Sequence, residues 1–183
     1  MFRARDVWAI RARLQPAEKT RDLALFNLAI DSKLRACDLT KLRARDIAHG
    51  EHVSSRAIVM QQKTHPVQFE ITEQTRMVLE AWKLQANLRS EDFLFPSRPH
   101  SSDHLSTRQY ARIVKAWVTA IGLDPTLYGT HTPRRTKASL IYRRTKNLRA
   151  AQRLHGHTKL ESTVRYLGVE VDDDLEMAEQ TEV

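Results

Sequence analysis

The segments H-T-P-R-R-T at residues 131–136 and H-G-H-T-K-L-E-S-T-V-R-Y at residues 155–166 decide how this chain is interpreted. Residues 131–165 hold ten Lys or Arg against one acid, Glu161. A tyrosine hydroxyl is a poor nucleophile at neutral pH, because its pKa is about 10. It becomes effective when cations surround both the hydroxyl and the anion that it attacks. For a phosphodiester, the segment offers two histidines, an arginine and a tyrosine: His131, Arg134, His157 and Tyr166.

The charge of the whole chain is unevenly distributed. The 183 residues carry 30 Lys or Arg and 22 Asp or Glu, which gives a net charge of +8. Seven of the acids lie in residues 169–183, which contain no Lys or Arg, so residues 1–168 carry a net charge of +15. A basic body of this kind attracts nucleic acid or an anionic surface. The alternative is a solvated basic face that has no partner.

Length and composition indicate one globular domain. A hydrophobic content of 41% and the absence of a low-complexity linker are typical of a compact, ordered chain. No run of about 20 apolar residues predicts a membrane span, and charges interrupt the apolar N-terminal stretch, unlike a secretory signal. The single cysteine, Cys37, excludes an internal disulfide and favours a reducing cytoplasm.

The hydrophobic periodicity predicts a mainly α-helical domain with one small antiparallel β-hairpin, which is an α+β arrangement. The strands are expected at 57–60 and 67–71, with Lys63 in the connection between them. Helices are expected at 4–14, 20–31, 36–45, 73–89, between Ser106 and Gly122, and at 133–145, 147–154 and 159–166.

Several polar and special residues predict where these helices begin and end. Thr72 is expected to cap the helix at 73, and Ser106 with Gln109 forms a capping-box pattern. Gly122 is expected to end the helix that Ser106 begins. Thr132 with Pro133 suggests an N-cap followed by proline at the first helical position.

Two further basic residues precede this segment, Arg35 at a helix start and Lys63 at the hairpin turn. Each candidate taken alone has a simpler explanation, such as a solvated cation, a capping histidine or a half-buried tyrosine. Their order along the chain makes a common site the better interpretation: Arg35, Lys63, His131, Arg134, His157 and Tyr166.

This order resembles the catalytic domain of the tyrosine recombinases, also called the phage integrase family. The segment L-R-A-C-D-L-T-K-L-R-A-R-D-I at 34–47 resembles the family's first box, and F-L-F-P at 93–96 resembles a segment found before its second box. H-T-P-R-R-T matches His-x-x-Arg, and Tyr166 follows His157 by nine residues, the usual spacing. Pro133 and His155 depart from the pattern, because the family more often has an apolar residue at each position.

The resemblance implies a tyrosine recombinase catalytic domain at residues 1–168 and an acidic C-terminal tail at 169–183. Most members of the family carry a separate N-terminal domain that clamps DNA. No such domain is expected here, because the resemblance begins almost at Met1, so independent tight DNA binding is not expected. An accessory DNA-binding protein is one way in which such a clamp could be replaced.

The resemblance also implies the role of each residue. Tyr166 attacks a DNA phosphate and forms a 3′-phosphotyrosyl bond, while Arg35 and Arg134 neutralise the non-bridging oxygens. His157 hydrogen-bonds one of these oxygens. Lys63 protonates the leaving 5′-oxygen, and His131 acts as a general base or orients the phosphate. The reaction needs no metal and no other cofactor.

Duplex DNA is the expected partner of the basic segment. The family's C-terminal segment suggests self-association in a tetrameric synapse with exchange of the tail, in a cytoplasmic, nucleoid-associated protein with no membrane partner. Three alternatives remain: a non-catalytic DNA-binding integrase remnant, a type IB-like topoisomerase, and a basic protein that binds RNA or an acidic protein. The expected phosphate contacts are Arg135, Lys137, Arg143, Arg144, Lys146, Arg149 and Arg153.

Overall fold

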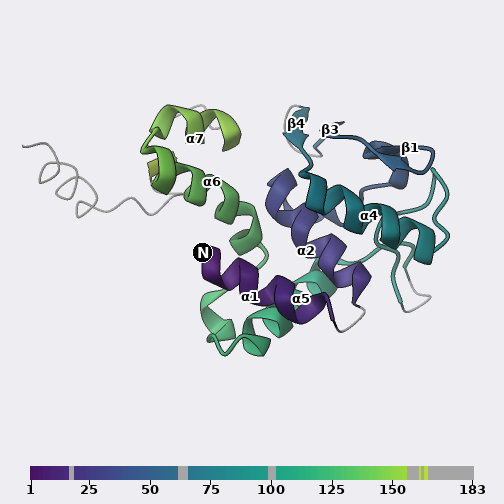
Figure 1. The fold of residues 1–183 in the computed structure, drawn as a ribbon, viewed down its shortest axis with the longest axis horizontal. Helices are drawn as coiled ribbons and strands as arrows, with labels where there is room; N and C mark the ends of the chain where they lie inside the picture. The colour runs from purple at the N-terminus through teal and green to yellow at the C-terminus, as the bar shows by residue number, and fades with distance from the viewer. Residues whose placement is uncertain (17–18, 62–65, 99–101, 156–160, 162, 165–183) are drawn as a thin grey trace, which may run out of the picture. The chain divides into compact units, whose positions relative to one another are not determined.

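The computed structural model describes most of the chain as two compact units, Met1–Lys137 and Ala138–Val183, and each unit is described by itself. The described residues are 1–16, 19–61, 66–98, 102–155, 161, 163 and 164 (Figure 1). In this part of the chain, no helix is both long and apolar enough to cross a membrane.

Helix α2 (Thr20–Ser32) lies at the centre of the first unit, where 11 of its 13 residues are buried. It packs against α1 (Ala4–Leu14) and α4 (Glu73–Gln85), and α1 also packs against α5 (Thr107–Ala120) (Figure 1). Leu25, Phe26 and Leu28 are fully buried, and the Phe26 ring contacts Trp117 edge-on at 5.2 Å between centroids. A helix that is apolar on most of its faces is stable only when other elements surround it, and α2 meets that condition.

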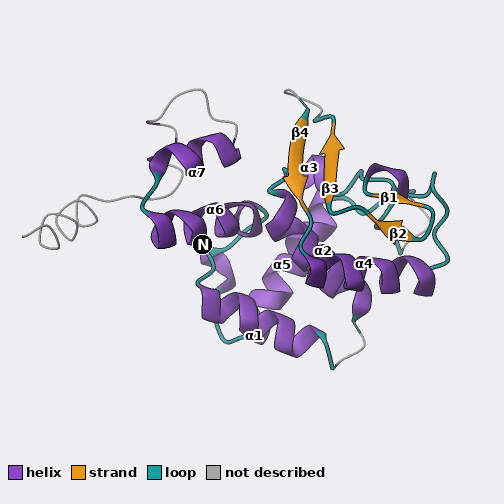
Figure 2. Cartoon of the chain, turned by 45° about the horizontal axis from the view of Figure 1, so that its top comes forward, coloured by secondary structure: helices purple, strands orange, loops and turns teal. Residues whose placement is uncertain are grey.

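The predicted hairpin is present as β3 (Arg56–Val59) and β4 (Val67–Glu70), paired antiparallel with Ala57 opposite Phe69 (Figure 2). Ala57, Val59 and Phe69 face the core, while Ile58 between them is 66% exposed. A second two-stranded ladder, β1 (Ala48–His49) with β2 (His52–Val53), was not predicted. Two residues per strand are too few to show an alternating pattern in a sequence.

The helix predicted at 36–45 is wrong beyond its first turn. The structure has α3 (Ala36–Leu39) and then a separate 3-10 turn, η1 (Ala44–Asp46). Between them, the Leu42 carbonyl accepts a hydrogen bond from the Leu94 amide, and the Ala44 amide donates to the Asp92 carbonyl. Pairing with this distant segment takes the backbone groups that a continuous helix would use.

The predicted helix ends are partly confirmed. The Ser106 hydroxyl accepts from the Gln109 amide at 3.1 Å, and Gly122 follows α5 with a φ of +75°. Thr72 stands at the N-cap of α4, but its side chain makes no capping bond and instead donates to Asp31. Helix α4 ends at Gln85 rather than 89, because Asn87 adopts the left-handed conformation.

Helix α6 (His131–Thr145) begins two residues before the predicted start, after the 3-10 turn η2 (Pro125–Leu127). In the second unit, α7 (Leu148–His155) follows, and a small apolar cluster joins Ala138, Tyr142 and Ala151 with Leu148. Most of the helix predicted at 159–166 lies outside the described residues, although residues 161, 163 and 164 are helical.

Candidate active site

Arg35 is held at the junction of two helices. Helix α2 ends at Ser32, and Lys33 turns the chain in the left-handed conformation with a φ of 54°. Arg35 is then the N-cap of α3, where its carbonyl accepts the amides of Asp38 at 3.0 Å and Leu39 at 2.9 Å. These bonds fix the backbone of Arg35, and therefore the point from which its side chain extends.

His131 and Arg134 lie three residues apart on the first turn of α6, so their side chains are on neighbouring positions of the helix surface. The turn is anchored by Thr132, whose amide donates to the Gly129 carbonyl at 2.9 Å and whose hydroxyl accepts the Gly129 amide at 3.1 Å. The His-x-x-Arg motif is therefore presented by the first turn of a helix. The predicted N-cap at Thr132 and helix start at Pro133 are wrong, because α6 begins at His131.

The first unit brings Arg35, His131 and Arg134 together. The pKa of His131 lies below its usual value although the residue is exposed, first because neighbouring atoms remove part of the water around the imidazole and then because Arg134, Arg135 and Arg35 repel its protonated form. Screening by salt limits such repulsion between exposed charges to about 10 Å, so the three arginines lie in the neighbourhood of His131. A lowered pKa keeps the imidazole neutral near pH 7, which is the form that a general base requires.

Nη1 of Arg35 and Nε of Arg134 are buried but make no hydrogen bond to any described residue. A buried donor without a partner is costly, and the cost is greater for a charged group. A guanidinium donates through a rigid planar fork that matches the oxygens of a phosphate. These two buried nitrogens, which lack a partner among the described residues, are therefore suited to bind an anionic ligand.

Three predicted catalytic residues, Lys63, His157 and Tyr166, lie outside the described residues. Their assignments stay predictions. The acidic tail at 169–183 also lies outside the described part of the chain.

Asp31, which no sequence motif indicated, lies on α2 four residues before Arg35 and is 3% exposed. One carboxylate oxygen accepts from Lys137 Nζ at 2.8 Å. The other accepts from the Thr72 amide at 3.0 Å, the Thr72 hydroxyl at 2.7 Å and the Thr75 hydroxyl at 2.7 Å. Burial raises the pKa of Asp31, but the bonds from Lys137 and the threonines outweigh it and hold the pKa below its usual value. An acid inside the otherwise apolar stretch of α2 was the signal that could have revealed it.

The predicted phosphate contacts are in different environments. Lys137 forms the ion pair with Asp31, and its side chain is 23% exposed. Arg135 is half-buried, whereas the side chain of Arg153 on α7 is outside the described part of the structure. The remaining contacts are all exposed: Arg143, Arg144, Lys146 and Arg149. All seven assignments to DNA stay predictions.

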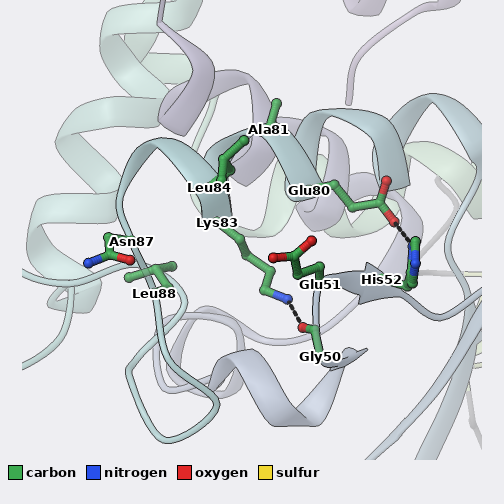
Figure 3. A pocket seen from close by; sticks show the side chains of 9 residues that line it. All are labelled: Gly50, Glu51, His52, Glu80, Ala81, Lys83, Leu84, Asn87 and Leu88. Carbon is green, nitrogen blue, oxygen red and sulfur yellow. Dashed lines mark hydrogen bonds and ion pairs between the residues drawn. The ribbon is translucent and has the colours of Figure 1, made fainter.

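A cavity of about 330 Å³ lies elsewhere in the first unit, between the β1–β2 turn and α4 (Figure 3). Lys83 points to the turn and donates to the Gly50 carbonyl at 2.7 Å, while Glu80 points to His52 at 4.0 Å. These polar groups are already engaged with one another. None of the predicted site residues lines this cavity.

Within the described residues, no three His, Cys, Asp or Glu side chains are grouped closely enough to hold a metal ion. The metal independence of the reaction stays a prediction.

The sequence of the chain matches the model of the phage integrase family over residues 2–172. A curated relative, the "Probable integrase/recombinase YoeC" of Bacillus subtilis (strain 168), is 29% identical over 152 residues, which cover 83% of this chain and 80% of the relative.

Solved structures of recombinases share the fold. The crystal structure of XerA recombinase has a TM-score of 0.77 at 19% identity and covers 98% of this chain. The post-cleavage complex of the XerH site-specific recombinase with its palindromic difH substrate has a TM-score of 0.75 at 16% identity and covers 97%. This chain spans 64% of the XerA structure and 52% of the XerH structure. The similarity confirms the predicted fold class, a mainly helical tyrosine recombinase catalytic domain with small antiparallel sheets.

Proposed function

The chain belongs to the phage integrase family, and from this premise we propose that it is a site-specific DNA recombinase that cuts and rejoins duplex DNA through a 3′-phosphotyrosyl intermediate. The observation that carries the proposal is the pair of buried, unpartnered nitrogens on Arg35 and Arg134 beside a histidine of lowered pKa. This arrangement supports the binding of a tetrahedral anion. The relation to XerH, whose structure contains a cleaved DNA substrate, supports DNA as the source of that anion.

In the proposed reaction, the Tyr166 hydroxyl oxygen attacks the scissile phosphorus and a P–O bond to the 5′-oxygen breaks. The bond energy is retained in the phosphotyrosyl ester, so rejoining is the reverse displacement by a 5′-hydroxyl and needs no ATP. Negative charge grows on the non-bridging oxygens as the phosphorane forms. Arg35 and Arg134 stabilise this charge, because a guanidinium stays protonated and can hold two oxygens at once.

The remaining assignments concern protons. His131, kept neutral by its cationic surroundings, accepts the proton of Tyr166 or orients the phosphate. Lys63 donates a proton to the leaving 5′-oxygen, and His157 donates a hydrogen bond to a non-bridging oxygen. No metal ion takes part in this scheme.

We further propose that the exposed basic residues of α6 and α7 contact the phosphates of the same duplex. The acidic tail at 169–183 docks on a neighbouring subunit in a tetrameric synapse, and an accessory protein assists DNA binding in a nucleoid-associated complex. Deletion of 169–183 is expected to change assembly on DNA or DNA affinity; if sedimentation and binding are both unchanged, the tail has neither role.

The decisive experiment traps the covalent intermediate. The protein is incubated with labelled duplexes that carry a nick beside a randomised centre, so that the short strand released by cleavage diffuses away. The wild-type chain is expected to form an adduct that survives SDS, and Tyr166→Phe is expected to form none. Tyr128→Phe is the matched control, because Tyr128 stacks on Phe2 at 5.3 Å and belongs to the core of the first unit.

The other outcomes separate the competing functions. DNA binding without any adduct from the wild-type chain would identify a non-catalytic remnant. An adduct on all sequences, with relaxation of supercoiled DNA, would identify a topoisomerase. An adduct that persists in Tyr166→Phe would remove Tyr166 from its assigned role.

A further inference from the structure

A buried ion pair connects the two arginine-bearing segments of the candidate active site. Asp31 on α2 and Lys137 on α6 are 106 residues apart in the sequence, and their charged atoms are 2.8 Å apart. The Asp31 side chain is 4% exposed and the Lys137 side chain 23%, so water weakens this pair less than it would weaken a fully exposed pair. The carboxylate also holds the first turn of α4 through Thr72 and Thr75.

Each member of the pair is close in sequence to one of the two arginines. Asp31 precedes Arg35 by four residues, with only the end of α2 and the Lys33 turn between them. Lys137 follows Arg134 by three residues on α6, close to the 3.6 residues of one turn. The ion pair therefore links the backbone that carries Arg35 to the backbone that carries Arg134.

The Asp31 carboxylate offsets the positive charges of Lys33 and Lys137, which lie close to it. Lys33 is 8% exposed and lies near both partners: burial and then Lys137 lower the pKa of Lys33, while Asp31 and Glu70 raise it. Without the Asp31 carboxylate, two cations would remain close together in a poorly hydrated position. Their repulsion would push apart the segments that the carboxylate now holds.

Stability alone is a weak explanation for such a pair, because an apolar replacement of similar volume is often as stable as a buried ion pair. A defined geometry is a better explanation. We infer that Asp31 and Lys137 are positioning residues that set the spacing between the guanidinium groups of Arg35 and Arg134. This inference rests on the proposed function, since it assigns the spacing to the two oxygens of one phosphate.

The test compares Asp31→Asn, Lys137→Met and the double variant, all in the full chain. Each substitution keeps the approximate shape of the side chain and removes its charge. Single-turnover adduct formation on a nicked duplex is measured at saturating DNA, together with DNA affinity. Each single variant is expected to slow adduct formation roughly 10- to 100-fold, the scale of a misplaced catalytic group. Asp31→Asn is expected to change DNA affinity little, whereas Lys137→Met also removes a predicted phosphate contact. The double variant is expected to be no slower than the slower single variant, because both remove the same link.

A second substrate distinguishes positioning from general damage. A duplex with a methylphosphonate at the scissile position lacks one charged oxygen, so it depends less on two correctly spaced guanidinium groups. The defect of Asp31→Asn is expected to shrink on this substrate. An equal defect on both substrates would mean that the pair serves only the fold, and the inference would be wrong.

Two further variants serve as controls. Lys137→Arg keeps the charge and is expected to restore most of the rate. Glu91→Gln breaks the exposed Arg45–Glu91 ion pair of the same unit and is expected to leave the rate unchanged. If Asp31→Asn does not fold, the double variant decides, since it leaves no unbalanced charge between positions 31 and 137. A wild-type rate in the folded variants overturns the positioning role alone, whereas no adduct from the wild-type chain overturns the proposed function and the inference with it.

Discussion

The two units of the chain use their basic residues in different ways. In Met1–Lys137, several cations are drawn into the packing: Arg11 donates to Asn27 at 2.8 Å, Arg21 to the Pro96 carbonyl at 2.9 Å and Lys83 to the Gly50 carbonyl at 2.7 Å. In Ala138–Val183, Arg143, Arg144, Lys146 and Arg149 are exposed, as are other cations of the first unit, among them Arg5, Arg13 and Arg112. A high density of Lys and Arg therefore does not by itself identify a nucleic-acid surface. Burial separates the cations that hold the fold from those that are available to a ligand.

Among the described residues, the apolar cores of the two units differ in size. The core of the first unit includes the fully buried Leu25, Phe26 and Leu28 on one central helix. The cluster described in the second unit consists of Ala138, Tyr142 and Ala151, with Leu148 packed against it. The predicted phosphate-binding groups of the second unit therefore belong to a unit with a small described apolar cluster, whereas Arg35 and Arg134 belong to the unit with the large one.

The largest expected effect comes from Arg134→Ala in the first unit. Loss of one positioned donor to the transition state is expected to slow adduct formation by roughly 10²- to 10³-fold, with little loss of DNA affinity. Arg143→Ala is the matched control on the same helix, where the side chain is exposed. We expect the control to reduce affinity and leave the rate at saturating DNA unchanged. If both variants behave alike, the distinction between chemical and binding cations fails.

A core substitution in each unit is expected to have a smaller and unequal effect. Leu28→Ala, at a fully buried position, should lower the free energy of unfolding by about 2 to 5 kcal/mol. Leu148→Ala, at a partly buried position, should lower it by about 1 kcal/mol or less. Urea denaturation followed by circular dichroism measures both, and equal losses would contradict the contrast between the two cores.

The smallest effect is expected from three exposed cations together. Replacing Arg143, Arg144 and Arg149 with alanine should reduce the slope of log affinity against log salt concentration by about 0.9 for each DNA phosphate that the variant no longer neutralises. The control replaces the exposed Arg5, Arg13 and Arg112 of the first unit, which removes the same total charge. Fluorescence anisotropy at several salt concentrations measures the slopes. Identical slopes for the two triple variants would mean that only net charge matters.

Local sequence patterns were sufficient for much of the fold. Helices α1, α2 and α5 and the β3–β4 hairpin lie within a few residues of their predicted positions, because each has a strong apolar period. The wrong part of the 36–45 helix is explained by hydrogen bonds to residues 92 and 94, which no local pattern encodes. Thr72 is at the expected N-cap position, but its hydroxyl donates a hydrogen bond to Asp31, which is distant in the sequence, instead of capping the helix.

For the site, the sequence by itself determined the chemistry on offer: the His-x-x-Arg motif, the upstream Arg35, and the spacing of His157 and Tyr166 that led to the correct family. These follow from residue type and order, which a sequence records directly. Only the tertiary structure decided that Arg35 lies near His131, that Lys137 is paired with Asp31, and that Nη1 of Arg35 and Nε of Arg134 lack a partner among the described residues. The physical reason is that burial and pairing depend on residues that are distant along the chain and become neighbours only when the core around α2 forms.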